Sequence, residues 1–84
     1  MMLLTKANRR ALAPLGSEAK IAVVKFFTPD SGWTWYASEF DGTDTFFGLV
    51  DGFEKELGCF SLSELASVRG KLGLPVERDR YFRP

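Results

Sequence analysis

The chain has 84 residues, of which 45% are hydrophobic and 26% charged, and its formal net charge is zero. It contains no histidine and one cysteine, which excludes Ser-His and Cys-His nucleophile pairs, imidazole metal ligands and an internal disulfide. Chains of this size bury roughly 60–65% of their unfolded surface, so we expect a single domain over residues 1–84 with a small core.

The first predicted element is a short helix over Lys6–Ala13. Thr5 is a residue type that caps helix N-termini, and Pro14 disfavours helix at the residue before it. The apolar stretch ahead of this helix is too short for a signal peptide or a membrane span. Together with the single thiol, this favours a soluble cytoplasmic protein with no membrane partner. The sequence contains no CxxC, P-loop or GxGxxG motif, and no cofactor is predicted.

Four strands are predicted next, over residues 21–28, 33–40, 45–50 and 54–60. Turn sequences rich in Pro, Asp and Gly separate them, which is typical of antiparallel hairpins. The first strand is apolar at both parities and is therefore expected to be central. The fourth is more polar and is expected at an edge, because charge protects an open edge from self-pairing.

A second short helix is predicted after Ser61, because Ser61-Leu62-Ser63-Glu64 matches a capping box. Gly70 is placed to end this helix in a left-handed conformation. The tail over residues 77–84 is interpreted as an extended arm or a short strand. The predicted fold class is α+β: a mainly antiparallel four-stranded β-meander with a short N-terminal helix and a short helix after the fourth strand.

Several short sequences, distributed over almost the whole chain, carry a resemblance to a known family. They are VVKFFTPDS at 23–31, WTWY at 33–36, FFG at 46–48, ELG at 56–58, FSLSEL at 60–65, RG at 69–70 and GLP at 73–75. Together they resemble an uncharacterised family of small bacterial domains of unknown function. Members are typically encoded on plasmids, phages and integrative elements, so the resemblance implies an accessory protein of a mobile element and brings no catalytic residues with it.

Few polar side chains in this sequence are candidates for catalysis or metal binding. Cys59 lies between Gly58 and Phe60, and a buried inert thiol is the favoured interpretation. Glu39, Asp41 and Asp44 cluster at one hairpin and could serve a metal-assisted enzyme. Asp and Gly are also the residues that turns require, so the structural interpretation is favoured, and we predict no catalytic and no metal-binding residues.

The aromatic residues are the leading candidates for contact with a partner. Trp33 and Trp35 share a parity in the second strand, and with Phe47 they would form an exposed platform if that sheet face were open. The favoured interpretation is that these rings belong to the core or to a dimer interface, because so small a chain needs them in its core. The residues predicted to contact a protein partner are Trp33, Trp35 and Tyr36, with Asp30 and Asp41 as rim charges.

The charges suggest two further hypotheses, because residues 30–64 carry a net −7 and the flanking segments are basic. Nucleic acid could be bound through a basic helix face and the C-terminal arm, with Lys6, Arg9, Arg10, Arg78 and Arg80 as contacts. Conversely, spaced acidic residues can imitate a phosphate backbone. That idea requires one shared face for Asp30, Glu39, Asp41, Asp44 and Asp51.

The expected function is that of a small non-enzymatic interaction protein of a mobile genetic element. Its partner is expected to be a protein, such as a host defence or DNA-processing factor. Nucleic acid and a second copy of the chain are the alternative partners.

Overall fold

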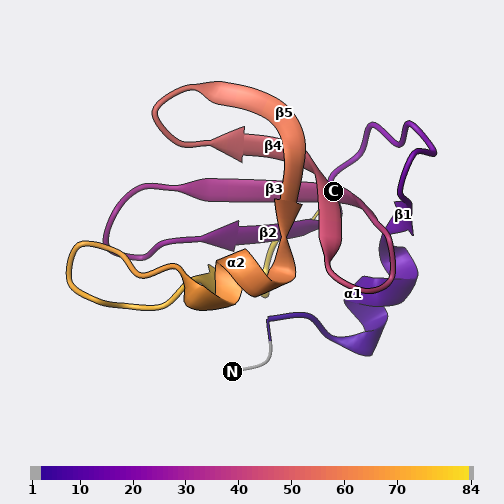
Figure 1. Cartoon of the computed structure of the whole chain (residues 1–84). Helices are drawn as coiled ribbons and strands as arrows, with labels where there is room; N and C mark the ends of the chain where they lie inside the picture. The colour runs from indigo at the N-terminus through magenta and orange to yellow at the C-terminus, as the bar shows by residue number, and fades with distance from the viewer. Residues whose placement is uncertain (1–2, 84) are drawn as a thin grey trace.

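A six-stranded sheet with two short helices makes up the fold (Figure 1). The computed structural model describes residues 3–83. Four strands follow one another as antiparallel neighbours: β2 (Val24–Phe27), β3 (Thr34–Phe40), β4 (Thr45–Asp51) and β5 (Lys55–Ser61). The predicted α+β class and mainly antiparallel sheet are therefore confirmed, and β5 lies at an edge as expected.

The predicted count of four strands is wrong, because two strands of two residues extend the sheet. β1 (Ala13–Pro14) pairs in parallel with the last two residues of β3. β2 has four residues and β3 has seven, so β2 leaves the end of β3 unpaired, and β1 pairs with that end. β6 (Glu77–Arg78) pairs with β2 and forms the other end of the sheet order, so the tail begins as a strand.

Local side-chain contacts set the starts of both helices. At α1 (Lys6–Ala11), Thr5 Oγ1 accepts the amide hydrogen of Asn8 at 3.1 Å, and Asn8 Oδ1 accepts that of Thr5 at 3.0 Å. At α2 (Leu62–Ser67), Ser61 Oγ accepts the amide hydrogen of Glu64 at 3.0 Å. Both helices end earlier than predicted, because the next residues turn to extended backbone.

A β-bulge in β3 decides which side chains reach each face of the sheet. The register of β3 against β4 shifts between Ala37 and Glu39, so Ser38 is an extra residue. We call the side that α2 packs against the covered face. It bears Val24, Phe26, Trp35, Ala37, Phe40, Phe46 and Phe60. The opposite side, here called the open face, bears Tyr36, Glu39, Phe47, Leu49 and Leu57.

The core lies on the covered face, where Leu65 of α2 and Leu4 of the N-terminal segment close over the sheet. Phe46 is stacked between Phe40 and Phe60, with ring centroids 4.5 and 5.3 Å apart. Figure 1 shows α2 in front of the sheet and the C-terminal end of the chain behind it. None of the described helices is long and apolar enough to cross a membrane.

Two glycines that face each other across β4 and β5 give a matched test of this packing. A Cβ at Gly48 would overlap the carbonyl oxygen of Tyr36, whereas a Cβ at Gly58 would have no atom within 4 Å. We expect Gly48→Ala to lower the free energy of unfolding by about 3 kcal/mol or more, because backbone atoms must move. Gly58→Ala should change it by no more than about 0.5 kcal/mol. Urea denaturation measures both, and equal effects would contradict the close approach of β3 to Gly48.

Candidate functional site

Trp33, Trp35 and Phe47 do not form a shared aromatic platform, because they lie on different faces of the sheet. Trp35 points to the covered face and is 7% exposed, as a member of the core. Phe47 and Tyr36 lie on the opposite side of the sheet. The platform required an open face, and α2 and the N-terminal segment cover the face that carries the tryptophans. The favoured interpretation, that these rings belong to the core, is confirmed for Trp35.

A different row of aromatic rings, formed by Trp35, Trp33 and Phe53, extends from the core to the surface. Trp33 stacks on Trp35 with ring centroids 5.9 Å apart, and Phe53 meets Trp33 edge-on at 5.3 Å. Phe53 lies in the turn between β4 and β5 and is 94% exposed. Two packed indole rings therefore support an apolar side chain that stands almost fully in water.

Asp30 has a structural role beside this arrangement. Its Oδ2 accepts the amide hydrogens of Leu72 at 2.7 Å and of Leu74 at 3.4 Å. A Cβ at Gly70 would overlap Asp30 Oδ1, so Gly70 permits this close approach. It does not end α2 with a positive φ as predicted, since the helix already ends at Ser67. Asp30 thus holds the loop that carries Leu72, which is 80% exposed.

The turns that contain Asp30, Phe53 and Leu72 lie at the same end of the sheet, on the left in Figure 1. We call the surface formed by Asp30, Trp33, Phe53 and Leu72 the loop end. It combines exposed apolar side chains with turns that hydrogen bonds and ring contacts hold in place. The sequence analysis identified Asp30 and Trp33 but missed Phe53 and Leu72.

The acidic residues Asp41 and Asp44 of the hairpin each accept hydrogen bonds from different parts of the chain. Asp41 Oδ1 accepts the amide hydrogens of Thr43, Asp44 and Thr45 at 2.8–3.1 Å. The carboxylate of Asp44 accepts the amide and hydroxyl hydrogens of Ser63 in the first turn of α2, both at 2.8 Å. Within residues 3–83, no group of three or more acidic or cysteine side chains is placed to hold a metal ion.

The proposed imitation of a phosphate backbone fails on this geometry. It required one face for the five acidic residues, but Asp30 holds a loop at one end of the sheet. Glu39 is 3% exposed on the open face, and Asp44 caps α2 on the other side. Cys59 also departs from expectation, because it is exposed on the edge strand β5.

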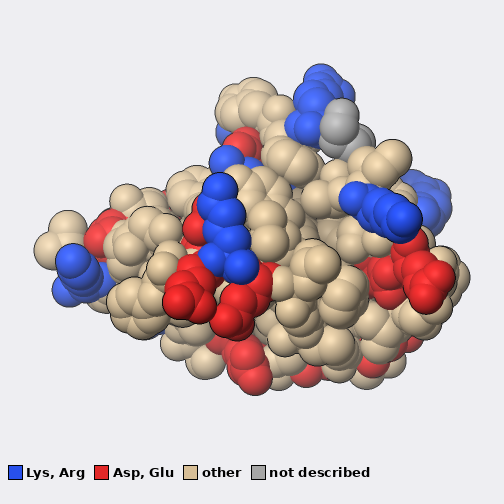
Figure 2. Space-filling model, turned by 90° about the horizontal axis from the view of Figure 1, so that it is seen from above, with Lys and Arg blue, Asp and Glu red and all other residues tan. Residues whose placement is uncertain are grey.

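The basic residues of the nucleic-acid hypothesis come from separate elements. Lys6, Arg9 and Arg10 belong to α1, which lies beside β1 and the end of β3, whereas Arg78 belongs to β6 at the edge beyond β2. Arg9 lies over the Phe40 ring at 5.4 Å. Figure 2 shows basic side chains as separate groups with acidic ones between them on the face seen from above.

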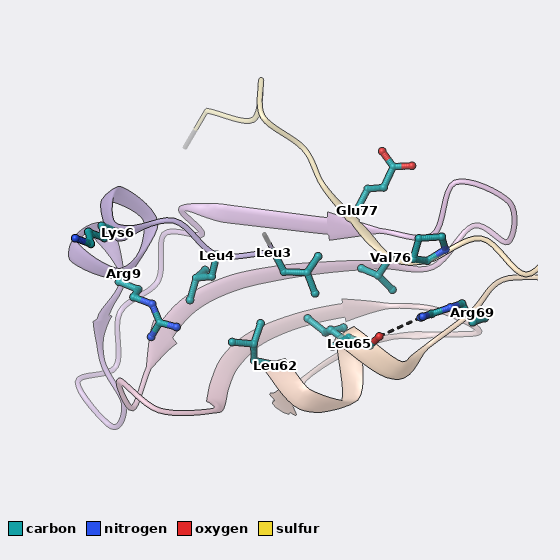
Figure 3. Close-up of a pocket in the computed structure, with 11 residues that line it drawn as sticks. Leu3, Leu4, Lys6, Arg9, Leu62, Leu65, Arg69, Val76 and Glu77 are labelled. Atoms are coloured by element: carbon teal, nitrogen blue, oxygen red, sulfur yellow. Dashed lines mark hydrogen bonds between the residues drawn. The ribbon is translucent and has the colours of Figure 1, made fainter. Parts of the chain in front are cut away.

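A cavity of about 880 Å³ opens on the covered face between the N-terminal segment, α2 and residues 75–77. Figure 3 shows Leu3 and Leu4 pointing across it toward Leu62 and Leu65. Its charged neighbours are not buried, and Arg69 is tied to the carbonyl oxygen of Ala66 at 3.0 Å. The cavity therefore presents core side chains and no buried polar group that would orient a ligand.

A second hollow, of about 830 Å³, lies on the open face under the loop that follows β1. Tyr36, Phe47, Leu49 and Leu57 supply its apolar walls, and Ser38 and Glu39 contribute polar groups. Tyr36 is the sequence-predicted contact residue that the structure places here, 5.9 Å from Phe82 of the C-terminal arm. The sequence analysis did not identify this hollow.

These features define a small α+β protein with a mainly antiparallel sheet, exposed apolar side chains at its loop end and a hollow on its open face. The chain matches, over residues 1–84, the model of a family described as a protein of unknown function (DUF2958), and it belongs to that family. This confirms the resemblance to an uncharacterised family. Comparisons with curated proteins and with solved structures gave no match.

The hydrogen bonds that Asp41 accepts lead us to expect that the free energy of unfolding depends on pH. Three backbone amides donate to this carboxylate, which holds the pKa of Asp41 below its ordinary value of 3.8. Because the folded-state pKa is the lower one, ionised Asp41 stabilises the fold above that ordinary value. The contribution disappears as the pH falls through the folded-state pKa.

We therefore expect Asp41→Asn to lower the urea midpoint at pH 7 and the difference from the natural chain to shrink as the pH is lowered from 7 to below about 4. Glu54→Gln removes the same charge from an exposed residue and serves as the control. A midpoint difference for Asp41→Asn that stays constant over this range would contradict the assignment.

Proposed function

We propose that this protein is a non-enzymatic interaction protein that binds another protein through the loop end. The observation that carries the proposal is the ring of Phe53, which is 94% exposed and rests on Trp33. In the setting that the family resemblance implies, its partner would be a host or DNA-processing protein that a mobile element encounters.

Physical chemistry supports an aromatic anchor at this position. Exposing a phenyl ring to water is unfavourable, and burying it at an interface recovers that free energy. The supporting rings of Trp33 and Trp35 are stacked, so less conformational entropy is lost when Phe53 is buried against a partner. Aromatic residues in such settings are frequent hot spots of protein interfaces.

Leu72 is a second exposed apolar side chain at this end of the sheet, on the loop that the carboxylate of Asp30 holds. Because Asp30 already accepts backbone amides, its contribution to binding is the fixed position of the loop rather than a rim charge. Asp41 lies in the connection between β3 and β4, away from this end of the sheet (Figure 1). The proposed contact set is therefore Phe53, Trp33 and Leu72.

The decisive experiment uses the tagged full-length chain and its Phe53→Ala variant as parallel baits in bacterial lysate, with and without nuclease. We expect a protein that the natural chain retains after nuclease treatment and that Phe53→Ala loses. With the purified partner, Phe53→Ala should weaken binding at least about 30-fold, since hot-spot side chains contribute about 2 kcal/mol or more.

Tyr81→Ala is the matched control, because Tyr81 is 81% exposed and lies on the C-terminal arm. It should change the affinity less than about twofold if the loop end is the contact surface. Equal losses for both variants would contradict the proposal. Partners that disappear with nuclease would instead favour nucleic-acid binding through Lys6, Arg9, Arg10, Arg78 and Arg80.

A further inference from the structure

Glu39 is a buried carboxylate in the wall of the open-face hollow. Its side chain is 3% exposed, yet it lines a space of about 830 Å³. The backbone around it is fixed on both sides, since Glu39 pairs with Ala13 of β1 and with Phe47 of β4. These pairings fix the position in β3 from which the carboxylate projects.

Only one of the two carboxylate oxygens of Glu39 has a partner. Oε1 accepts the amide hydrogen of Gly16 at 2.7 Å. Within residues 3–83, no group donates a hydrogen bond to Oε2 or forms an ion pair with this carboxylate. Every fully buried side-chain oxygen of the described residues has a hydrogen-bond partner. Oε2 has no partner, so it is not fully buried and keeps contact with solvent. Glu39 lines the hollow, so we place this contact there.

The other groups of the hollow favour a ligand that donates hydrogen bonds. The hydroxyl of Ser38 donates to the carbonyl oxygen of Phe47 at 3.2 Å, which leaves its oxygen as an acceptor beside Glu39. Three acidic and two basic residues line the hollow, so its lining carries an excess of one negative charge. An ionised carboxylate that has lost most of its hydration is stabilised by a positive partner.

From this geometry we propose that the open-face hollow binds an organic ammonium group carried on an apolar or aromatic body. The ammonium donates to Oε2 of Glu39 and to Ser38 Oγ, and the body packs against Phe47 and Leu49. A guanidinium fits less well, because its planar fork uses both oxygens of a carboxylate and Gly16 already occupies Oε1. The site lies on the other face of the sheet from Trp33, and its assignment does not depend on the loop-end proposal.

The loop that forms one wall of the hollow contains one residue in the left-handed region. Glu18 has φ = 61°, the single described non-glycine residue with a positive φ, and it lies in the loop that forms one wall. This conformation is unfavourable for a side chain with a Cβ. It accompanies the turn that directs the amide of Gly16 at Glu39.

The test is a titration of the isotopically labelled full-length chain with 2-phenylethylammonium, followed by backbone amide NMR shifts. We expect saturable shifts at Gly16, Ser38, Glu39 and Phe47. The neutral isostere 2-phenylethanol should bind at least about tenfold more weakly, since it lacks the charge-assisted hydrogen bond. The corresponding 2-phenylethylguanidinium should also bind more weakly than the ammonium.

Two variants distinguish a specific contact with Glu39 from an effect of the net negative charge of the hollow. Glu39→Gln keeps an oxygen for the amide of Gly16 and should weaken ammonium binding at least about tenfold. Asp51→Asn removes a charge from the same lining and should have an effect of less than about threefold. If Glu39→Gln does not fold, the comparison of ammonium with alcohol on the natural chain decides alone.

The source of the ammonium is distinguished by a second probe, Nα-acetyl-lysine amide. Binding of this probe at the same residues indicates a lysine side chain of a protein, whereas binding of the free amine alone indicates a small metabolite. Equal affinity for ammonium and alcohol, tighter binding of the guanidinium, or no saturable shift at Glu39 would overturn the proposal. The Phe53→Ala experiment tests the loop end alone, and its outcome does not affect the interpretation of ammonium binding in the hollow.

Discussion

The extra residue Ser38 in β3 controls the arrangement of both faces of the sheet. A regular strand would send Phe40 to the open face and Glu39 to the covered face, because successive side chains alternate. The bulge instead places Phe40 beside Trp35 and Ala37, where it stacks on Phe46. It also leaves Glu39 in the hollow rather than in an apolar core, where an unpaired carboxylate would be strongly unfavourable.

The sequence predicted those parts of the fold that local physical chemistry decides. The strands β2 to β5 follow from apolar runs between Pro, Asp and Gly turns, and Thr5 and Ser61 cap the helices as their residue types indicate. The strands β1 and β6 have two residues each and carry no periodic signal. They form because β3 and β2 leave edges that a neighbouring segment can pair with, which is a property of the assembled sheet.

The candidate surfaces were harder to predict, because they depend on which face becomes covered. Trp33 and Trp35 were assigned to one face correctly, but nothing in their spacing says that α2 packs there. Phe53 lies in the predicted connection between the third and fourth strands, and nothing in the sequence indicates that its ring is exposed to solvent. The spacing of Trp35, Ala37 and Phe40 was the one available signal for the bulge, since three apolar core positions at steps of two and then three interrupt the alternation.

The loop end and the open-face hollow share β3 but use its two sides. Tyr36 and Glu39 face the hollow, whereas Trp35 supports Trp33 and Phe53 from the covered face. Coupling between two sites requires an element with two arrangements that each site biases differently. β3 is paired with β4 along its length, and β2 and β1 pair with its other side. These pairings hold β3 on both sides, so we expect occupation of either proposed site to leave the affinity of the other unchanged.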